Sequence, residues 1–332
     1  MKNTNQFWSP RMSRVVAMIA VWLAASAIPA HADACATGVA MSPTTVSFSP
    51  NYDFTDTVQH TTIVTSLRIT GVINGCAYLI GAQGGGAARS LSGGSGHTMA
   101  YQLYTNSQLT NVFLDPLSGA SGTASNMLGF VAGTQSTVAL TYYFSIPSSQ
   151  YIPSGLYQDG VLLSLYSGTF LEPSLPIASV SANHEASVSA IALLSIVPTG
   201  NAFDINQTSN TMDFGTLSPG QSLSVQALFK SNDSTGYEVY MRSENSSRLK
   251  LFGGSATIPY SLTLSASNSP NLTGVTSSPA LTPTDLQITT GTGPAPSAAD
   301  RLNLSATIGS FSAQAYVAGT YSDAITVTIV GN

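Results

Sequence analysis

Apolar residues recur at every second position in two stretches of the chain. They are Val161, Leu163 and Leu165 in the first stretch, and Ile325, Val327 and Ile329 in the second. A period of two places these side chains on one side of an extended backbone. Each stretch therefore predicts a β-strand with one buried face.

The same short motif, Gly-x-Tyr-x-Asp, precedes both stretches. It begins at Gly155 and again at Gly319, 164 positions later. Further matches keep the same order along the chain: Tyr78 with Tyr237 and Tyr101 with Tyr260, each 159 apart, and Val46-Ser47-Phe48 with Met212-Asp213-Phe214, 166 apart. Matches that keep chain order while their offset drifts indicate two homologous domains that differ by small loop insertions.

Other short apolar runs, separated by turns rich in Gly, Pro, Asn and Ser, predict the remaining strands. In the first half they are Thr44–Phe48, Thr61–Ile73, Ala77–Gly81, Met99–Tyr104, Thr137–Phe144 and Gly160–Tyr166. In the second half they are Ser187–Val197, Ser222–Phe229, Tyr237–Arg242, Pro259–Ala266, Leu302–Ile308 and Asp323–Val330. The chain is thus expected to be all-β, with two immunoglobulin-like sandwiches of about seven strands. The segment from Gly81 to Gly96 is expected to be a flexible connection.

The first 32 residues have the pattern of a secretory signal peptide. Basic residues precede an apolar run from Val15 to Ala27, and Ala30-His31-Ala32 offers a cleavage site. Cleavage there leaves an N-terminal domain of residues 33–184 and a C-terminal domain of residues 185–332. We expect export through the periplasm to the cell surface. No second run of 18 apolar residues follows, so the mature chain is not expected to span a membrane.

Charge argues against nucleic acid as a partner. Of ten basic residues, Lys2, Arg11 and Arg14 leave with the signal peptide, so seven remain against fifteen acidic residues and the net charge is −8. Phosphate binding needs clustered basic residues, which this chain lacks.

The two cysteines, Cys35 and Cys76, both lie in the first domain. An even count in an exported chain without a Cys-x-x-Cys spacing favours a disulfide over a metal site or a nucleophile, with unpaired thiols as the alternative. A loop of about forty residues closed by such a bond would stabilise the domain by a few kcal/mol.

The two copies differ in the length of chain after the motif strand. About twenty residues, including Leu175, Ile177 and Val180, lie between Tyr166 and the next domain, enough for a strand that completes the first sandwich. Only two residues come after Val330. A sandwich without its last strand exposes unpaired N–H and C=O groups beside an apolar groove and accepts a strand from another chain. We therefore expect the second sandwich to be incomplete, with Ile325, Val327 and Ile329 lining a donor-strand groove.

Several short motifs of this sequence resemble motifs of the spore coat protein U family. The resemblance is carried by Tyr101-Gln102-Leu103-Tyr104, Thr110-Asn111-Val112-Phe113, Phe214-Gly215, Ser231-Asn232, Gly236-Tyr237 and the terminal GTYSD strand. That family includes subunits of archaic chaperone-usher pili, in which a chaperone and then the next subunit lend the missing strand. The resemblance implies a periplasmic chaperone, an outer-membrane usher and an adjacent pilin as partners. A second domain without a cysteine pair departs from the family pattern.

A two-domain member resembles the tip adhesin of such pili. Only Asp33 and Ala34 precede Cys35 after cleavage, which is too short an arm to insert into a neighbour, so this chain is expected to accept a strand and give none. Cleavage further upstream would leave a longer arm. A shaft or minor pilus subunit stays the alternative.

If the second domain joins the pilus, the first domain faces outward and is expected to attach to a surface. Family tip adhesins hold surfaces through hydrophobic loops, and exposed apolar loops mark interaction sites. The candidates here are Met127, Leu128, Phe130, Val131, Tyr151 and Ile152. The structural alternative is that Met127 and Phe130 fold onto the core as part of a short strand. The surface would be abiotic or belong to a host.

No catalytic motif is present, so we expect no enzyme and no cofactor. His60, His97 and His184 stand apart from any Ser or Cys nucleophile motif, and His97 is expected to be a solvated loop residue. Asp204, Asn206 and Asn210 lack the glycine and terminal Glu of a calcium loop, so no metal is expected. Two other classes remain open: a secreted spore-coat or matrix structural protein, and a saccharide-binding module, which the absence of Trp from the mature chain disfavours.

Overall fold

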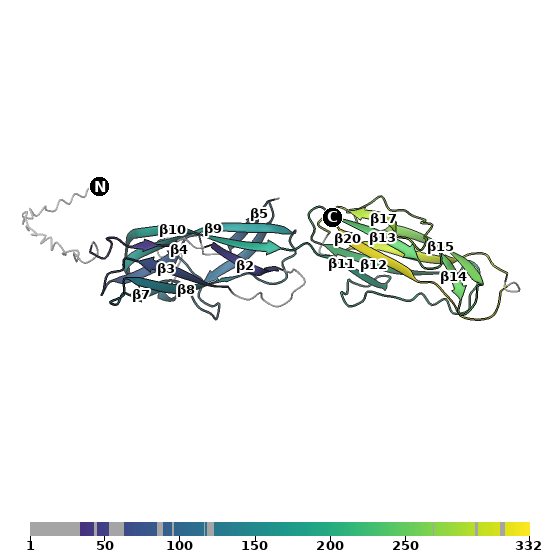
Figure 1. Cartoon of the computed structure of the whole chain (residues 1–332), viewed down its shortest axis with the longest axis horizontal. Helices are drawn as coiled ribbons and strands as arrows, with labels where there is room; N and C mark the ends of the chain where they lie inside the picture. The colour runs from purple at the N-terminus through teal and green to yellow at the C-terminus, as the bar shows by residue number, and fades with distance from the viewer. Residues whose placement is uncertain are drawn as a thin grey trace, which may run out of the picture.

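The computed structural model contains two β-sandwiches arranged end to end (Figure 1). The structure describes residues 34–42, 45–52, 63–84, 89–94, 96–115, 117, 123–267, 269–295, 298–312 and 316–332. Nearly all regular structure in these residues is strand, with one 3₁₀ turn at Ala124–Asn126. The all-β prediction is confirmed. The expected signal peptide, residues 1–32, lies outside the described residues.

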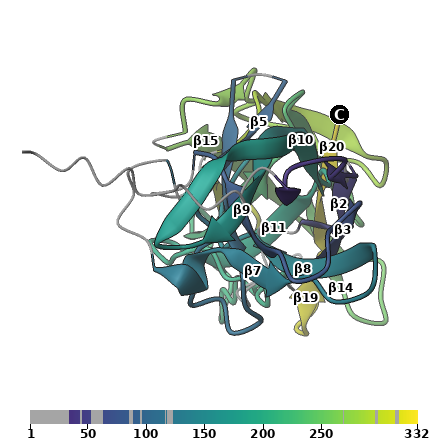
Figure 2. The same cartoon turned by 90° about the vertical axis from the view of Figure 1, so that its left-hand side faces the viewer.

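The described residues of the N-terminal unit, which spans residues 34–188, form ten strands. They are β1 (Ala40–Met41), β2 (Thr45–Tyr52), β3 (Ile63–Thr70), β4 (Ala77–Ala82), β5 (Arg89–Gly93), β6 (Thr98–Tyr104), β7 (Leu128–Val131), β8 (Thr137–Ser145), β9 (Gly155–Thr169) and β10 (Glu172–Val188). One layer is β1-β3-β8-β6 and the other contains β7-β4-β9-β10-β2, with β5 between β6 and β9. Seen along the long axis in Figure 2, β9 and β10 lie across the sandwich from β3 and β8.

The core between these layers is rich in aromatic side chains. Tyr101, Tyr142, Phe144 and Tyr157 are all buried there. Aliphatic side chains such as Leu67, Leu163 and Leu165 complete this core.

The C-terminal unit, residues 192–332, also has two sheets. The larger sheet has the order β11 (Ala192–Pro198), β12 (Ser222–Ser231), β18 (Asp300–Ile308), β15 (Thr257–Ala266), β14 (Arg248–Leu251) and β19 (Tyr321–Ser322). The smaller sheet has the order β16 (Leu272–Thr273), β17 (Leu286–Gly291), β13 (Tyr237–Ser243) and β20 (Ile325–Gly331). A second, separate hydrophobic core lies between them.

Strand pairing agrees with the repeat in the sequence. The motif strand β9 pairs with β4, and its counterpart β20 pairs with β13. Tyr78 lies in β4 and Tyr237 in β13, while Tyr101 lies in β6 and Tyr260 in β15. Residues at matching places in the sequence thus occupy matching strands in the two units.

Two details of the sequence prediction are wrong. The Gly-rich segment 81–96 was expected to be a connection, but it contains β5, which pairs with both β6 and β9. The run from Ser187 to Val197 was expected to be one strand, but β10 ends at Val188 and β11 begins at Ala192. Because β10 continues past residues 184 and 185, we propose the domain boundary at residues 189–191.

The two units are joined by hydrogen bonds around Asn232, which is fully buried. The Asn232 side chain accepts a bond from the Ile191 amide at 2.7 Å and donates to the Ser189 carbonyl at 2.9 Å. From the N-terminal unit, the Ser154 amide donates to the Asn232 carbonyl at 2.7 Å. The linker and the loop before β9 are therefore both attached to the end of β12.

Candidate functional site

The candidate site lies between the two sheets of the C-terminal unit. Strand β20 pairs with β13 along one edge, and along its other edge it has no strand partner among the described residues. Strand β11 is likewise an edge strand, pairing only with β12 within that part of the chain. Strands β11 and β20 lie near each other but do not pair.

A cavity of about 1020 Å³ opens beside these edges. It lies between residues 208–217 on one side and residues 316–323 on the other. Its apolar lining comes mostly from the core, with Leu194, Ile196, Val225, Leu304 and Ala306 among the contributing residues. A cavity of this size, lined by apolar core residues together with polar loop residues and lying beside two strand edges, fits an extended polypeptide segment.

Three residues, Ile325, Val327 and Ile329, were predicted to line a donor-strand groove. Ile325 and Val327 line the cavity, whereas Ile329 packs against the core outside the cavity lining. All three are only partly buried. Sequence reasoning missed Met212, Phe214 and Leu217, which line the opposite wall from the connection between β11 and β12. The spacing of Met212 and Phe214, with one polar residue between them, was a usable signal.

A hydrogen-bonded aspartate holds the beginning of β20 in place. Asp323 accepts hydrogen bonds from the Tyr260 hydroxyl at 2.6 Å, the Ser243 hydroxyl at 2.6 Å and the Asn245 amide at 2.9 Å. Burial, and then the bond to Asp323, raise the pKa of Tyr260 well above its usual value. The aspartate of the motif therefore links β20 to β13 and β15 at the wall of the cavity.

The N-terminal unit repeats this link. The Tyr101 hydroxyl donates to Asp159, the motif aspartate of β9. Burial, followed by this hydrogen bond, raises the pKa of Tyr101 far above its normal range. The tyrosine–aspartate bond is thus a common feature of the two units.

The two units differ in what lies beside the motif strand. In the N-terminal unit β10 pairs antiparallel with β9 along its whole length and parallel with β2, which closes the sandwich. The expected closing strand after Tyr166 is therefore confirmed. Its inward side chains near the motif are Ala182, His184 and Ala186, all buried. No strand of the described chain occupies the corresponding place beside β20.

The residues facing these places differ in size. Leu103 of β6 lies opposite Phe144, while the matching Leu262 of β15 lies opposite Ala306. Phe144 fills the core beneath β10, whereas Ala306 lines the cavity. Among the described residues of the C-terminal unit, no strand takes the place of β10, and an alanine stands where the N-terminal unit has the Phe144 ring.

The structure contradicts the expectation that Met127 and Leu128 are exposed loop residues. Met127 is 5% exposed and Leu128 9%, because Leu128–Val131 form β7, which pairs with β4. The Phe130 ring stacks on Tyr78 with 5.3 Å between ring centroids. Only Val131 of this group is largely exposed, at 70%.

Tyr151 and Ile152 lie near the junction of the units. The Tyr151 hydroxyl donates to the Ser231 carbonyl of the C-terminal unit, and burial raises the pKa of Tyr151 to about 12. Ile152 is buried in the core of the N-terminal unit. These two residues therefore lie at the opposite end of the N-terminal unit from the β9–β10 turn.

Sequence reasoning missed the exposed apolar residues of that turn. Leu171 and Leu175 are 86% and 81% exposed. Strand β9 starts beside the junction and runs for 15 residues, so the turn lies about 50 Å from the C-terminal unit. Phe170, Tyr166 and Met127 pack against one another beneath it. The signal in the sequence was a hairpin turn, Thr169-Phe170-Leu171-Glu172, with apolar residues in place of the usual polar ones.

Cys35 and Cys76 form the expected disulfide. The bond ties the segment before β1 to the β3–β4 connection at the same end of the unit as the β9–β10 turn. The first residues of the described chain are held twice, since β1 also pairs with β3.

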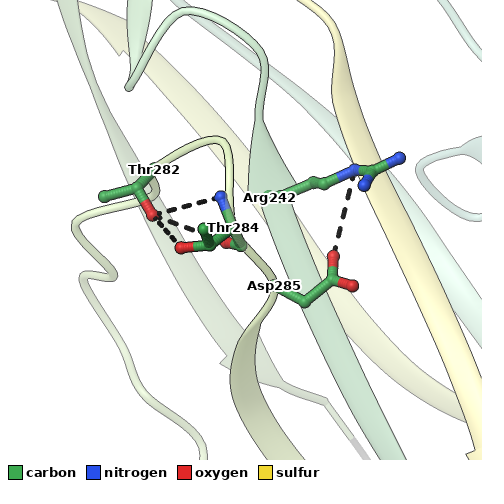
Figure 3. Close-up of polar contacts among 4 residues, drawn as sticks. All are labelled: Arg242, Thr282, Thr284 and Asp285. Atoms are coloured by element: carbon green, nitrogen blue, oxygen red, sulfur yellow. Dashed lines mark hydrogen bonds and ion pairs between the residues drawn. The ribbon is translucent and has the colours of Figure 1, made fainter.

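The charged groups offer no second site. No cluster of three or more potential metal ligands occurs in the part of the chain that the structure describes. Within that same part, no helix is long and apolar enough to cross a membrane. Arg242 and Asp285 form an ion pair, with 3.9 Å between Nε of Arg242 and Oδ1 of Asp285 (Figure 3). Beside this pair, the hydroxyl groups of Thr282 and Thr284 are hydrogen-bonded to each other. Both charged side chains are about half exposed, at 49% and 52%, which is typical of a solvated surface pair.

Comparison with known proteins agrees with the resemblance seen in the sequence. Residues 21–164 match the model of the Spore Coat Protein U domain, which confirms the resemblance in that part of the chain. The chain matches none of the curated proteins.

Pilus adhesins are among the solved structures that match this chain. One is a complex of the chaperone CsuC with the tip subunit CsuE from archaic chaperone-usher Csu pili of Acinetobacter baumannii, at 12% identity and a TM-score of 0.45, covering 88% of this chain and 99% of the other. Another is the CupB6 tip adhesin of Pseudomonas aeruginosa, at 11% identity and a TM-score of 0.36, covering 88% and 94%. A third is CfaE, the adhesive subunit of the CFA/I fimbria of enterotoxigenic Escherichia coli, at 13% identity and a TM-score of 0.36, covering 87% and 92%. Similarity this low does not carry residue roles over to this chain.

Proposed function

We propose that this protein is a non-enzymatic adhesive subunit at the tip of a chaperone-usher pilus. One observation carries the proposal. The motif strand is covered by β10 in the N-terminal unit, while in the C-terminal unit the same strand borders a cavity that reaches the apolar core. A unit with an open edge and an open core gains stability from any strand that fills both.

The occupant of this cavity would change during assembly. A periplasmic chaperone would supply a strand during export, and the arm of an adjacent pilin would replace it at the usher. Each large apolar side chain that the arm buries would contribute about 1.5 to 3 kcal/mol, so several together would make a long-lived joint.

The N-terminal unit supports a position at the end of the polymer. Its groove is filled by its own β10, and residues 34–42 and 45–52 are held by the disulfide, β1 and β2. A unit with a filled groove and no free segment among these residues would neither accept nor donate a strand, whereas a shaft subunit needs both surfaces.

A strand fused to the chain tests the role of the groove. We would append a flexible linker and a pilin-type arm after Asn332 and ask whether a periplasmic chaperone still co-purifies. The fused arm should fill the groove, abolish chaperone capture and keep the subunit out of pili. The matched control is the same fusion with Asp at every inward position of the arm, which should still bind the chaperone. Equal capture of both fusions would contradict the proposal.

Attachment would occur at the end of the N-terminal unit opposite the C-terminal unit. Leu171, Leu175 and Val131 expose large apolar side chains there, whereas Met127, Tyr166 and Phe170 would support the turn from below. Val131 belongs to the segment first considered for this role. Exposed apolar groups on a supported turn would bind a hydrophobic surface without a shaped pocket.

Substitution of the turn tests attachment. Pili carrying Leu171→Ser and Leu175→Ser should lose most binding to a hydrophobic surface, with no change in the melting temperature of the subunit. Leu286→Ser is the matched control, because Leu286 is also exposed, at 39%, but lies in the C-terminal unit. Full binding by the double variant would rule out this surface.

A further inference from the structure

The closing strand of the N-terminal unit places a basic residue at one defined position. His184 of β10 lies directly opposite Asp159 of β9 in the strand register and is fully buried. Its ring lies 5.9 Å from the Tyr101 ring, the same tyrosine that donates to Asp159. A second basic residue, Arg89, lies opposite Tyr101 on β5 and interacts electrostatically with Asp159. The positive charge of Arg89 and the imidazole ring of His184, which burial keeps neutral above about pH 4, thus both lie beside this tyrosine–aspartate bond.

The C-terminal unit has the same tyrosine–aspartate bond without the basic side chains. Tyr260 and Asp323 both line the open cavity. The residue beside Tyr260 on the neighbouring strand is Ser247, whose carbonyl accepts the Tyr260 amide at 3.2 Å. All three groups that donate to Asp323, from Tyr260, Ser243 and Asn245, are uncharged. The cavity therefore presents a carboxylate whose hydrogen bonds bring no positive charge.

We propose that the strand that enters this groove carries a basic side chain at the position opposite Asp323, and that this position selects among arms. The inference rests on the proposed function, in which the groove accepts an extended strand. The occupant is then the arm of another polypeptide, complementary in charge to Asp323. Filling the groove removes water from around the carboxylate, so a cation at that position forms a charge-assisted bond. An apolar or acidic residue there leaves a buried charge without a counter-charge and is disfavoured.

Positions on either side of the basic residue should be apolar. In the N-terminal unit Ala182 lies opposite Val161 and Ala186 opposite Tyr157. The motif alignment makes Ile325 and Tyr321 the corresponding residues of the groove wall. Because Ala306 replaces the bulky Phe144, the arm needs a larger residue than alanine opposite Ile325. The predicted arm is thus a strand with inward apolar residues at alternate positions, except for one inward position that carries a cationic residue.

A series of synthetic arms tests this position on the full chain. Each peptide copies Pro176–Val188 with leucine in place of Ala178 and Ala182, and differs only at the position of His184, which is His, Lys, Leu or Glu. A fifth peptide has Leu at that position and Lys at the position of Ala182. We expect the Lys peptide to bind at least about tenfold more tightly than the Leu peptide at neutral pH, and the His peptide to gain this advantage as its imidazole becomes protonated. The Glu peptide and the displaced Lys peptide should bind more weakly still.

The Asp323→Asn variant tests the cause of the preference. Asparagine keeps an acceptor for the Tyr260 hydroxyl but removes the charge, so the His and Lys peptides should lose their advantage over the Leu peptide. Asp285→Asn, on the exposed surface, is the charge-matched control and should leave the preference intact. If Asp323→Asn does not fold, the peptide series on the unaltered protein still decides the question.

The outcomes separate this inference from the proposed function. If none of the five peptides binds, the groove does not accept a strand and both proposals fail. If the His, Lys and Leu peptides bind equally well, the groove accepts strands but has no charge-selective position, and only this inference is overturned.

Discussion

The N-terminal and C-terminal units share a motif strand but differ in how that strand is completed. In the N-terminal unit β9 is covered by β10, and aromatic rings fill the core. In the C-terminal unit β20 is an edge strand beside a cavity of about 1020 Å³, with Ala306 in the place of Phe144. One sequence pattern thus occurs once beside a covering strand and once, within the described residues, at the edge of a sheet.

A second contrast concerns covalent support. The N-terminal unit has the Cys35–Cys76 disulfide, while the C-terminal unit contains no cysteine. We therefore expect the N-terminal unit to melt at the higher temperature, with the C-terminal unit depending on its occupant for comparable stability. Substitutions that alter one unit at a time should change the difference in melting temperature between the two units in a defined direction.

Removing the disulfide should have the largest effect. The bond closes a loop with a sequence separation of 41 residues, and loop-closure entropy gives it a value of about 4 kcal/mol. The double variant Cys35→Ser, Cys76→Ser should lower the melting temperature of the N-terminal unit strongly and leave the C-terminal transition unchanged. Calorimetry resolves the two transitions. An unchanged N-terminal transition would show that the disulfide does not account for the contrast.

Acid should destabilise the N-terminal unit through His184. Burial, and after it the Arg89 charge, lower the pKa of His184 to about 4, while the Asp159 charge opposes this shift. The unfolded chain binds a proton near pH 6.5 and the folded unit only near pH 4, so stability falls as the pH drops between these values, by about 3 kcal/mol in all.

Urea unfolding at several pH values measures this loss. His184→Asn should remove most of the slope between pH 6.5 and pH 4. The C-terminal unit is the internal control, since it contains no histidine. A slope that survives the substitution would assign the acid sensitivity to other groups.

Breaking the tyrosine–aspartate bond should cost less, about 1 to 3 kcal/mol in either unit, because one acceptor is left without its donor. Tyr260→Phe should destabilise the C-terminal unit, and Tyr101→Phe the N-terminal unit. Each substitution is the control for the other in calorimetry. If both shift the same transition, the bonds do not belong to separate units.

The surface ion pair should contribute least. Arg242 and Asp285 are about half exposed and 3.9 Å apart, so replacing either with alanine should change stability by less than about 0.5 kcal/mol. Thermal unfolding in low and high salt measures this small effect. A change above about 1 kcal/mol would mean that this pair, and not only the open edge, determines the stability of the C-terminal unit.

Much of this arrangement could be predicted from the sequence because the signals were local. Period-two apolar residues gave the motif strands, the ordered matches gave two units, and the cysteine count gave the disulfide. The closing strand β10 was predicted by counting residues after Tyr166. These features need no knowledge of which distant segments meet.

The features that sequence reasoning missed depend on tertiary contacts. Met127 and Leu128 lie in a run flanked by Gly, Ser and Thr, and such a run looks the same whether it is a loop or a short strand. Its burial is decided by pairing with β4, far away in the sequence. Strand β5 was missed because it contains a single large apolar residue, Leu91, between serines. Leu175 was assigned correctly to a strand, but its outward direction depends on the irregular register between Pro173 and Pro176.

Calorimetry of the full chain with a pilin-type arm added in trans tests the central claim most directly. We expect two transitions without the arm, the lower one from the C-terminal unit. With the arm, the lower transition should rise by more than about 10 °C while the upper one, from the closed N-terminal unit, stays in place. If the arm moves neither transition, or moves both equally, the C-terminal sandwich is not an open acceptor.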